Sequence, residues 1–158
     1  MHYQRFQYSE LSEVQRKALD EAERISQNAY NPYSKFYVGA CLVAVGGQLI
    51  TGTNFENAAF GETICAERAA VVRANAMGLR GVTHIAIIGH GEDFDTTEVT
   101  APCGSCRQVL YELSQIRSGH LEVILSTTKK DKIVVTTINE LLPMAFGPRD
   151  VGVNVSRY

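Results

Sequence analysis

The chain lacks a long uninterrupted run of apolar residues. Hydrophobic residues make up 45% of its 158 residues and charged residues 20%, proportions typical of a globular domain that folds in water. No apolar run approaches the roughly 20 residues that a helix needs to cross a bilayer, and the first residues lack the hydrophobic region of a signal peptide. We therefore expect a cytoplasmic protein with no membrane partner.

An excess of positive charge is also missing. The formal net charge is −2, and the basic residues are scattered apart from Lys129, Lys130 and Lys132, which surround Asp131 in a predicted turn. Nucleic-acid binding usually leaves a basic stripe on a protein surface. We expect a solvated turn here and no nucleic-acid partner, so a nucleic-acid-binding or editing protein is a remote alternative.

Repeats, linkers and low-complexity tracts are absent as well. A chain of this length buries roughly 68–70% of its unfolded surface when it folds as one domain. We expect a single domain over residues 1–158, with irregular segments at 1–10 and 148–158.

The spacing of apolar residues and the positions of Gly and Pro predict the order of helices and strands. The expected elements are a helix from Ser9 or Ser12 to about residue 29, strands 36–45 and 48–54, a helix 65–77, a strand 82–89, a helix 103–116, strands 121–126 and 133–137, and a short helix 138–142. Strand–helix–strand units indicate an α/β fold. We expect a three-layer α/β/α domain with a mixed sheet of about five strands.

Cysteine is scarce but placed with a pattern. Four cysteines in a chain expected to be cytosolic argue against a disulfide framework and favour metal binding or catalysis. Cys41 lies inside the apolar run 38–43 and is predicted to be a core residue. Cys65 and the Cys103-x-x-Cys106 pair each stand where a helix is predicted to begin.

Three thiolates point to zinc, which accepts soft sulfur ligands in tetrahedral geometry. Cys65, Cys103 and Cys106 would leave the fourth position open, which favours a catalytic site over a structural one. Glu67, two residues after Cys65, is the candidate proton carrier. A structural zinc module without turnover and a Cys-x-x-Cys redox pair remain alternatives.

The charge of such a site needs compensation. Three thiolates and one zinc ion sum to −1, which opposes the activation of water. The two helix N-termini offset this excess. We expect Arg68 and Arg107 to do so too, by donating hydrogen bonds to sulfur. The alternative for each arginine is an exposed position on the surface of its helix.

Several motifs together resemble the zinc-dependent cytidine deaminases of the short-chain, homotetrameric type. The resemblance covers residues 15 to 150 approximately and rests on five stretches: Cys65–Arg68 (CAER), Pro102–Gln108 (PCGSCRQ), Asn31–Ala40 (NPYSKFYVGA), Gly52–Ala58 (GTNFENA) and Glu140–Pro148 (ELLPMAFGP).

The resemblance implies hydrolytic deamination of cytidine or deoxycytidine to uridine or deoxyuridine in pyrimidine salvage, with one Zn²⁺ per subunit and Glu67 as the catalytic residue. It implies that Asn54 and Glu56 bind the ribose hydroxyls and that Phe36 packs against the pyrimidine. The backbone at Ala66 would read the base edge. Phe146 would close the site of a neighbouring subunit in a homotetramer.

One stretch departs from the family pattern. Many members carry Tyr where this chain has Phe60, and residues 60–64 differ from the usual sequence before the CAER motif. The lost hydroxyl and the added charge of Glu62 are expected to alter the substrate range. A deaminase of a modified cytosine nucleoside, either N4-substituted cytidine or an aminoacyl-nucleoside antibiotic, is therefore the alternative function.

Overall fold

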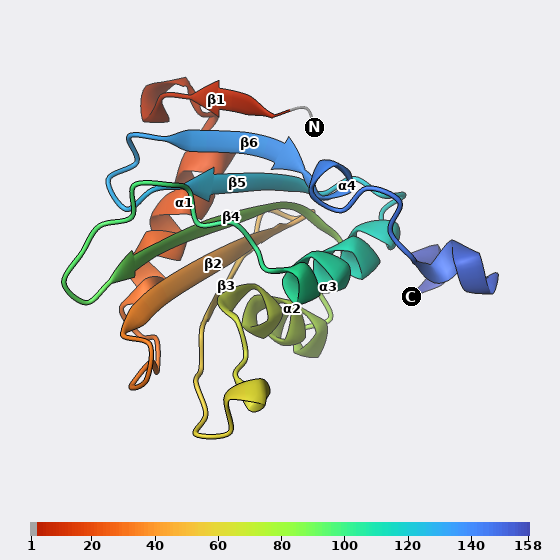
Figure 1. The fold of residues 1–158 in the computed structure, drawn as a ribbon. Coiled ribbons are helices and arrows are strands. Elements are labelled where there is room, and N and C mark those ends of the chain that lie inside the picture. Colours follow the sequence, from red (N-terminus) through yellow and green to blue (C-terminus); the bar gives the residue numbers. More distant parts are fainter. Residues whose placement is uncertain (1–2) are drawn as a thin grey trace.

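Six strands form one sheet in the computed structural model, which describes residues 3–158 (Figure 1). The strand order is β1-β6-β5-β4-β2-β3. The strands are β1 (Gln4–Phe6), β2 (Phe36–Ala44), β3 (Leu49–Thr53), β4 (Val82–Gly91), β5 (Glu122–Ser126) and β6 (Ile133–Thr137). The helices are α1 (Glu13–Ser26), α2 (Ala66–Ala76), α3 (Gly104–Gln115) and α4 (Ile138–Leu141), with 3₁₀ turns η1 (Tyr8–Glu10), η2 (Phe60–Glu62), η3 (Pro148–Val151) and η4 (Val155–Arg157).

Helices cover both faces of the sheet, as predicted. Helix α1 packs on one face, where Leu19 joins the buried side chains Cys41 and Ala86. Helices α2 and α3 cover the other face, where Ala70 and Leu110 join a second buried cluster. Successive strand residues face opposite sides of a sheet, so each inner strand contributes to both clusters. β4 and β5 are parallel and the other pairs are antiparallel, which confirms a mixed sheet.

The sheet has six strands rather than the expected five. The additional strand is β1, which pairs antiparallel with β6 at the sheet edge. The expectation of an irregular segment therefore does not hold for Gln4–Phe6. Three residues are too few to show a period, and pairing with the distant β6 decides their conformation. Residues 1 and 2 lie outside the described part.

The C-terminal segment carries the 3₁₀ turns η3 and η4. Over residues 3–158, no helix is both long enough and apolar enough to cross a membrane.

The hairpin between β5 and β6 is tied to α1. Nζ of Lys130 lies 2.7 Å from carboxylate oxygens of both Asp20 and Glu23 and 5.0 Å from the ring centroid of Tyr8. The prediction of a solvated turn is therefore wrong for Lys130, whose side chain is 19% exposed. Sequence spacing could not show this contact, because 110 residues separate Lys130 from Asp20.

Close packing of α2 on β3 positions the start of this helix. A Cβ atom at Gly52 would lie 2.4 Å from the amide nitrogen of Ala70 and 2.5 Å from the carbonyl oxygen of Ala66. Glycine is required here because the helix backbone lies directly against the strand. Gly78, two residues after the end of α2, adopts the left-handed conformation (φ 72°) that is common just beyond a helix. Helix α3 packs beside α2 on the same face of the sheet.

Candidate metal centre and active site

Three cysteine sulfurs meet where α2 and α3 begin. Cys65 immediately precedes α2, Cys103 immediately precedes α3, and Cys106 lies in the first turn of α3. Their Sγ atoms all lie within 4.8 Å of one another. Sulfurs bound at about 2.3 Å to a tetrahedral zinc ion lie about 3.8 Å apart, so the cluster fits zinc with little movement. Over residues 3–158, no further His, Cys, Asp or Glu side chains form such a group.

The local backbone leaves these sulfurs free to bind a metal. Neither Cys65 nor Cys103 caps its helix with its side chain, and the positive end of a helix favours a thiolate. A hydrogen bond with the Cys106 thiol lowers the pKa of Cys65 to about 6; burial opposes this effect, whereas Cys103 and the charge of Arg68 add to it. The contact with Cys65, together with burial, raises the pKa of Cys106. A soft, partly ionised donor set of this kind suits zinc, whose binding displaces the remaining thiol protons.

Glu67 lies beside the sulfurs in the first turn of α2 and is 5% exposed. Burial raises the pKa of its carboxyl to about 7, and the charge of Cys65 acts in the same direction, against hydrogen bonds from its own backbone N–H and the Cys106 thiol. A carboxyl with a pKa near neutrality can both accept and donate a proton at physiological pH. The sequence predicted a proton carrier at this position.

The two arginines have different surroundings. The positive charge of Arg68 contributes to the low pKa of Cys65. Arg107 donates from Nε to the Pro102 carbonyl at 2.9 Å and from Nη1 to the Leu141 carbonyl at 3.0 Å. These carbonyls, rather than a sulfur, are its hydrogen-bond partners. Arg107 therefore fixes the segment before α3 to the end of α4.

Asn54 follows β3 and is 8% exposed. Its Oδ1 accepts a hydrogen bond from the Val38 N–H at 2.9 Å, and its Nδ2 donates to the Phe36 carbonyl at 2.9 Å. The side chain therefore continues the β2–β3 pairing beyond the end of β3 and holds the backbone of Phe36 in place.

Glu56 is 7% exposed, although it is a carboxylate. Its Oε2 accepts hydrogen bonds from the backbone N–H groups of Tyr33 at 2.9 Å and Ser34 at 3.1 Å. Burial would raise the pKa of Glu56, but hydrogen bonds from the Ser34 hydroxyl and these two amides outweigh it and lower the pKa. Sequence reasoning missed the two amides. An Asn-Pro pair such as Asn31-Pro32 marks a turn but does not show which side chain the amides of the turn bind.

The remaining predicted binding residues differ in exposure. The Phe36 ring packs over Gly89, where a Cβ atom would lie 3.0 Å from Cε1 of Phe36. Ala66 is fully buried at the first position of α2, where backbone N–H groups have no partner within the helix. Phe146 is 65% exposed, and its carbonyl accepts a hydrogen bond from Nε2 of Gln108 at 2.9 Å. The Phe146 ring is therefore available to a neighbouring molecule.

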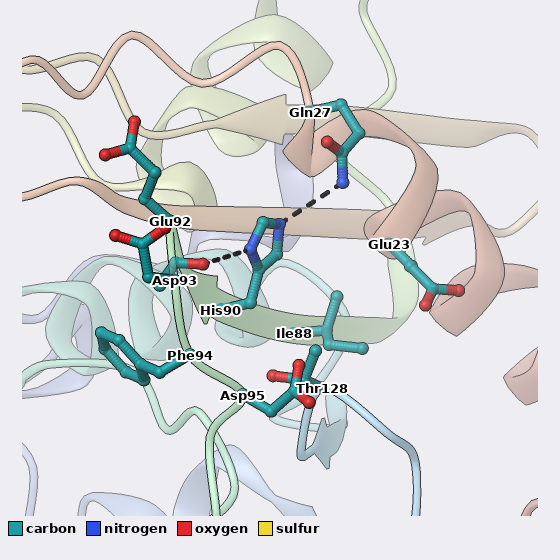
Figure 2. A pocket seen from close by; sticks show the side chains of 10 residues that line it. Glu23, Gln27, Ile88, His90, Glu92, Asp93, Phe94, Asp95 and Thr128 are labelled. Atoms are coloured by element: carbon teal, nitrogen blue, oxygen red, sulfur yellow. Dashed lines mark hydrogen bonds between the residues drawn. The ribbon is translucent and has the colours of Figure 1, made fainter.

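Cys41 and His90 lie away from the three-cysteine group, and Cys41 is the core residue that the sequence predicted. Cys41 is fully buried in the α1 side of the sheet, and burial raises its pKa to about 12. His90 lies over the α1 face: its ring stacks on Tyr37 with centroids 4.8 Å apart, and Nε2 lies 3.4 Å from Nε2 of Gln27 (Figure 2). Its Nδ1 lies 2.8 Å from the Gly91 carbonyl. Neither residue belongs to the metal centre.

The fold and the site together define an α/β protein with a three-cysteine zinc centre and a buried carboxyl beside it. Comparison with known proteins places it more closely. Residues 12–119 match the family model described as the cytidine and deoxycytidylate deaminase zinc-binding region. The chain belongs to this family.

Curated relatives and solved structures agree over most of the chain. A cytidine deaminase of Sporosarcina psychrophila is 40% identical over 135 residues, which are 85% of this chain and 93% of that protein. One from Halalkalibacterium halodurans is 41% identical over 133 residues, 84% of this chain and 94% of the relative. The crystal structure of a cytidine deaminase from Burkholderia pseudomallei matches with a TM-score of 0.75 and 39% identity, covering 86% of this chain and all (100%) of that one.

Proposed function

We propose that this protein is a zinc-dependent hydrolase that deaminates cytidine and deoxycytidine to uridine and deoxyuridine with release of ammonia. The observation that carries the proposal is the buried Glu67 carboxyl, with its pKa near 7, beside three cysteine sulfurs that fit one zinc ion. The relatives named cytidine deaminase support the choice of substrate.

The residues divide the work of the reaction. Zinc bound by Cys65, Cys103 and Cys106 would supply the Lewis acid that makes water nucleophilic near neutral pH. Glu67 takes a proton from the water that attacks C4 of the cytosine and delivers one to ring atom N3. It then passes a proton to the amino group that leaves as ammonia. The buried position of Glu67 keeps its carboxyl near the pKa that this two-way transfer needs.

The substrate is oriented by groups around the centre. We assign the pyrimidine face to Phe36 and the base edge to the backbone N–H at Ala66, which has no partner within α2. Asn54 and Glu56 are assigned to the ribose hydroxyls. The two amides bind Oε2 of Glu56, and the carboxylate keeps further lone pairs with which it can accept a hydrogen bond from a ribose hydroxyl. Its lowered pKa keeps Glu56 ionised as an acceptor at neutral pH.

Replacing Glu56 by Gln is expected to lower kcat/KM for cytidine by about 10- to 100-fold, because a hydrogen bond to a charged group contributes about 1.5–3 kcal/mol. Steady-state kinetics with cytidine and 2′,3′-dideoxycytidine tests the assignment. The loss is expected to be much smaller for the dideoxynucleoside, which lacks the hydroxyls. Exposed Glu98→Gln is the control for the change of charge. An equal loss on both substrates would contradict a ribose contact.

We further propose a homotetramer, formed by a single domain over residues 1–158, that works in cytoplasmic pyrimidine salvage. The exposed side chains of Phe146 (65%) and Met144 (103%) on the segment after α4 support contacts between subunits, because large apolar side chains grouped at a surface often mark an interface. Light scattering measures the mass in solution. A fully active monomer would contradict completion of each site by a neighbour.

The proposed reaction is tested by following ultraviolet absorbance during incubation with a panel of substrates. The panel contains cytidine, deoxycytidine, cytosine, deoxycytidine monophosphate and N4-substituted cytidines, each with and without a chelator. We expect chelator-sensitive turnover of the two nucleosides. Turnover of free cytosine or the nucleotide alone would overturn the nucleoside assignment, and a preference for N4-substituted cytidines would favour the alternative function.

A further inference from the structure

An exposed aromatic ring stands beside Phe36, in the acidic loop that follows β4. Phe94 is 61% exposed, and its ring centroid lies 6.2 Å from that of Phe36, with the ring planes tilted by 30°. The backbone holds it there: the Gly91 N–H donates to the Phe94 carbonyl at 2.9 Å. The sequence offered no signal for this residue, because it belongs to none of the motifs.

The register of β2 and β4 shows which face of the sheet carries this ring. Tyr37 is paired with His90, and both rings lie on the α1 face. Phe36 is paired with Gly91, so this neighbouring pair faces the opposite side, the side of α2 and α3. A Cβ atom at Gly91 would lie 2.1 Å from Cε1 of Phe94. The Phe94 ring therefore fills the space on the α2–α3 side that the missing side chain of Gly91 leaves.

Figure 2 shows the same division around the loop. The His90 ring points toward Gln27, the residue that follows α1, whereas the Phe94 ring points away from that helix. Although Phe94 and His90 are only four residues apart in the sequence, their rings lie on opposite faces of the sheet. The metal-binding cysteines and Glu67 belong to the face that Phe94 joins.

Strand order shows which part of a nucleoside Phe94 would meet. β2 lies between β4 and β3. Asn54 and Glu56 follow β3 on one side of Phe36, and Phe94 follows β4 on the other side. If the sugar binds near Asn54 and Glu56, the ring of Phe94 lies on the side of Phe36 away from the sugar.

The loop is anchored close to this ring. The Glu92 N–H donates to the Lys35 carbonyl at 2.9 Å, and Nζ of Lys35 lies 3.9 Å from Oε1 of Glu92. Lys35 itself adopts a left-handed conformation (φ 54°), which turns the chain directly into Phe36. The contact between Lys35 and Glu92 therefore fixes both the residue before Phe36 and the start of the loop that carries Phe94. The backbone segments that carry both aromatic rings are therefore held in place before a substrate arrives.

We propose that Phe94 is a second aromatic residue of the base-binding wall and extends the surface of Phe36 on the side away from the sugar. This inference rests on the proposed function, since it concerns how the same site recognises a planar heterocyclic base. Flat bases stack on aromatic side chains with little dependence on hydrogen bonding. Phe94 is thus a binding residue that strengthens the contact with the base rather than a proton carrier.

Kinetics of Phe94→Ala test the proposal. We expect KM to rise about 3- to 10-fold for both cytidine and deoxycytidine, with kcat changed by less than about 2-fold. The reason is that an aromatic contact with the base stabilises the bound substrate and the transition state equally, so its loss weakens binding without slowing the chemical step. The ratio of kcat/KM for the two nucleosides should stay the same, and Phe94→Tyr should restore KM. Tyr3→Ala, an exposed aromatic outside the site, is the control. An unchanged KM in Phe94→Ala would overturn the proposal while leaving deamination by the wild type intact.

The chain contains no tryptophan, which makes Phe94→Trp a site-specific fluorescent reporter. In a Glu67→Gln background, which is designed to bind substrate without turnover, we expect cytidine to quench the emission of Trp at this position. The same substitution at Tyr3 should show no response. If calorimetry records cytidine binding but the emission of Trp at position 94 does not change, the proposed contact between this residue and the base is wrong. Absence of deamination in the wild type would instead reject the proposed function.

Discussion

Replacing Glu67 by Gln is expected to leave zinc bound and to lower kcat for cytidine by at least about 10²–10⁴-fold, the range that general acid–base catalysis contributes. The amide keeps the shape and hydrogen-bonding size of the side chain but can neither accept nor release the transferred proton. Because three cysteines supply the proposed metal ligands, the zinc content should remain one ion per chain. The measurements are single-turnover kinetics and metal analysis on the same sample.

The matched control for Glu67→Gln is Glu13→Gln, which makes the same chemical change on the exposed surface of α1. It should retain full activity. If Glu67→Gln kept more than about one tenth of the wild-type kcat, Glu67 would not be the proton carrier. If the variant lost its zinc, the residue would have a structural part in holding the metal centre.

Replacing Cys106 by Ala is expected to remove most of the bound zinc and to reduce activity at least about 100-fold, since the loss of even an outer partner of a metal ligand costs about 10- to 100-fold. The chain provides a close control in Cys41→Ala. Both cysteines are fully buried (0% exposed) and both substitutions remove one sulfur atom from the interior, but Cys41 lies on the α1 face of the sheet. Cys41→Ala should keep one zinc ion per chain.

Thermal unfolding with and without a chelator separates metal loss from simple loss of packing. A ligand that binds the folded state stabilises it, so a chelator should lower the melting temperature of the wild type. Cys41→Ala should melt lower than the wild type through its cavity and still respond to the chelator. Cys106→Ala should no longer respond. A chelator response in Cys106→Ala equal to that of the wild type, with zinc still present, would contradict its assignment as a ligand.

Much of the site could be predicted because most of its reactive residues lie in short stretches of sequence. Cys103, Cys106 and Glu67 lie within a few residues of a helix start, where local geometry is set by neighbours along the chain. Helix starts depend on nearby caps and apolar spacing, and the boundaries of α2 and α3 differ from the predicted ones by one residue at each end. The meeting of the two helices then followed from the demand of one metal ion for three sulfur ligands.

Contacts between distant segments could not be predicted in the same way. Arg107 was expected to bond sulfur, but its guanidinium reaches the carbonyl of Leu141, 34 residues away. The capture of Glu56 by two backbone amides joins residues more than 20 apart in the chain. Such partners depend on the relative placement of strands and turns, which residue type and spacing do not specify.

Residue types and their spacing along the chain specify the proposed chemistry of this protein: three thiolates, one carboxyl and the helices that present them. Tertiary structure alone decided which side chains surround that centre. β1 forms because its residues pair with β6 at the edge of the sheet. Phe94 lies beside Phe36 because the register of β2 on β4 places Gly91 opposite Phe36. Site residues that lie close together in the sequence, at the start of a helix, can be recognised from the sequence. The residues that line the rest of the binding site come from distant segments, and the pairing of strands brings them together.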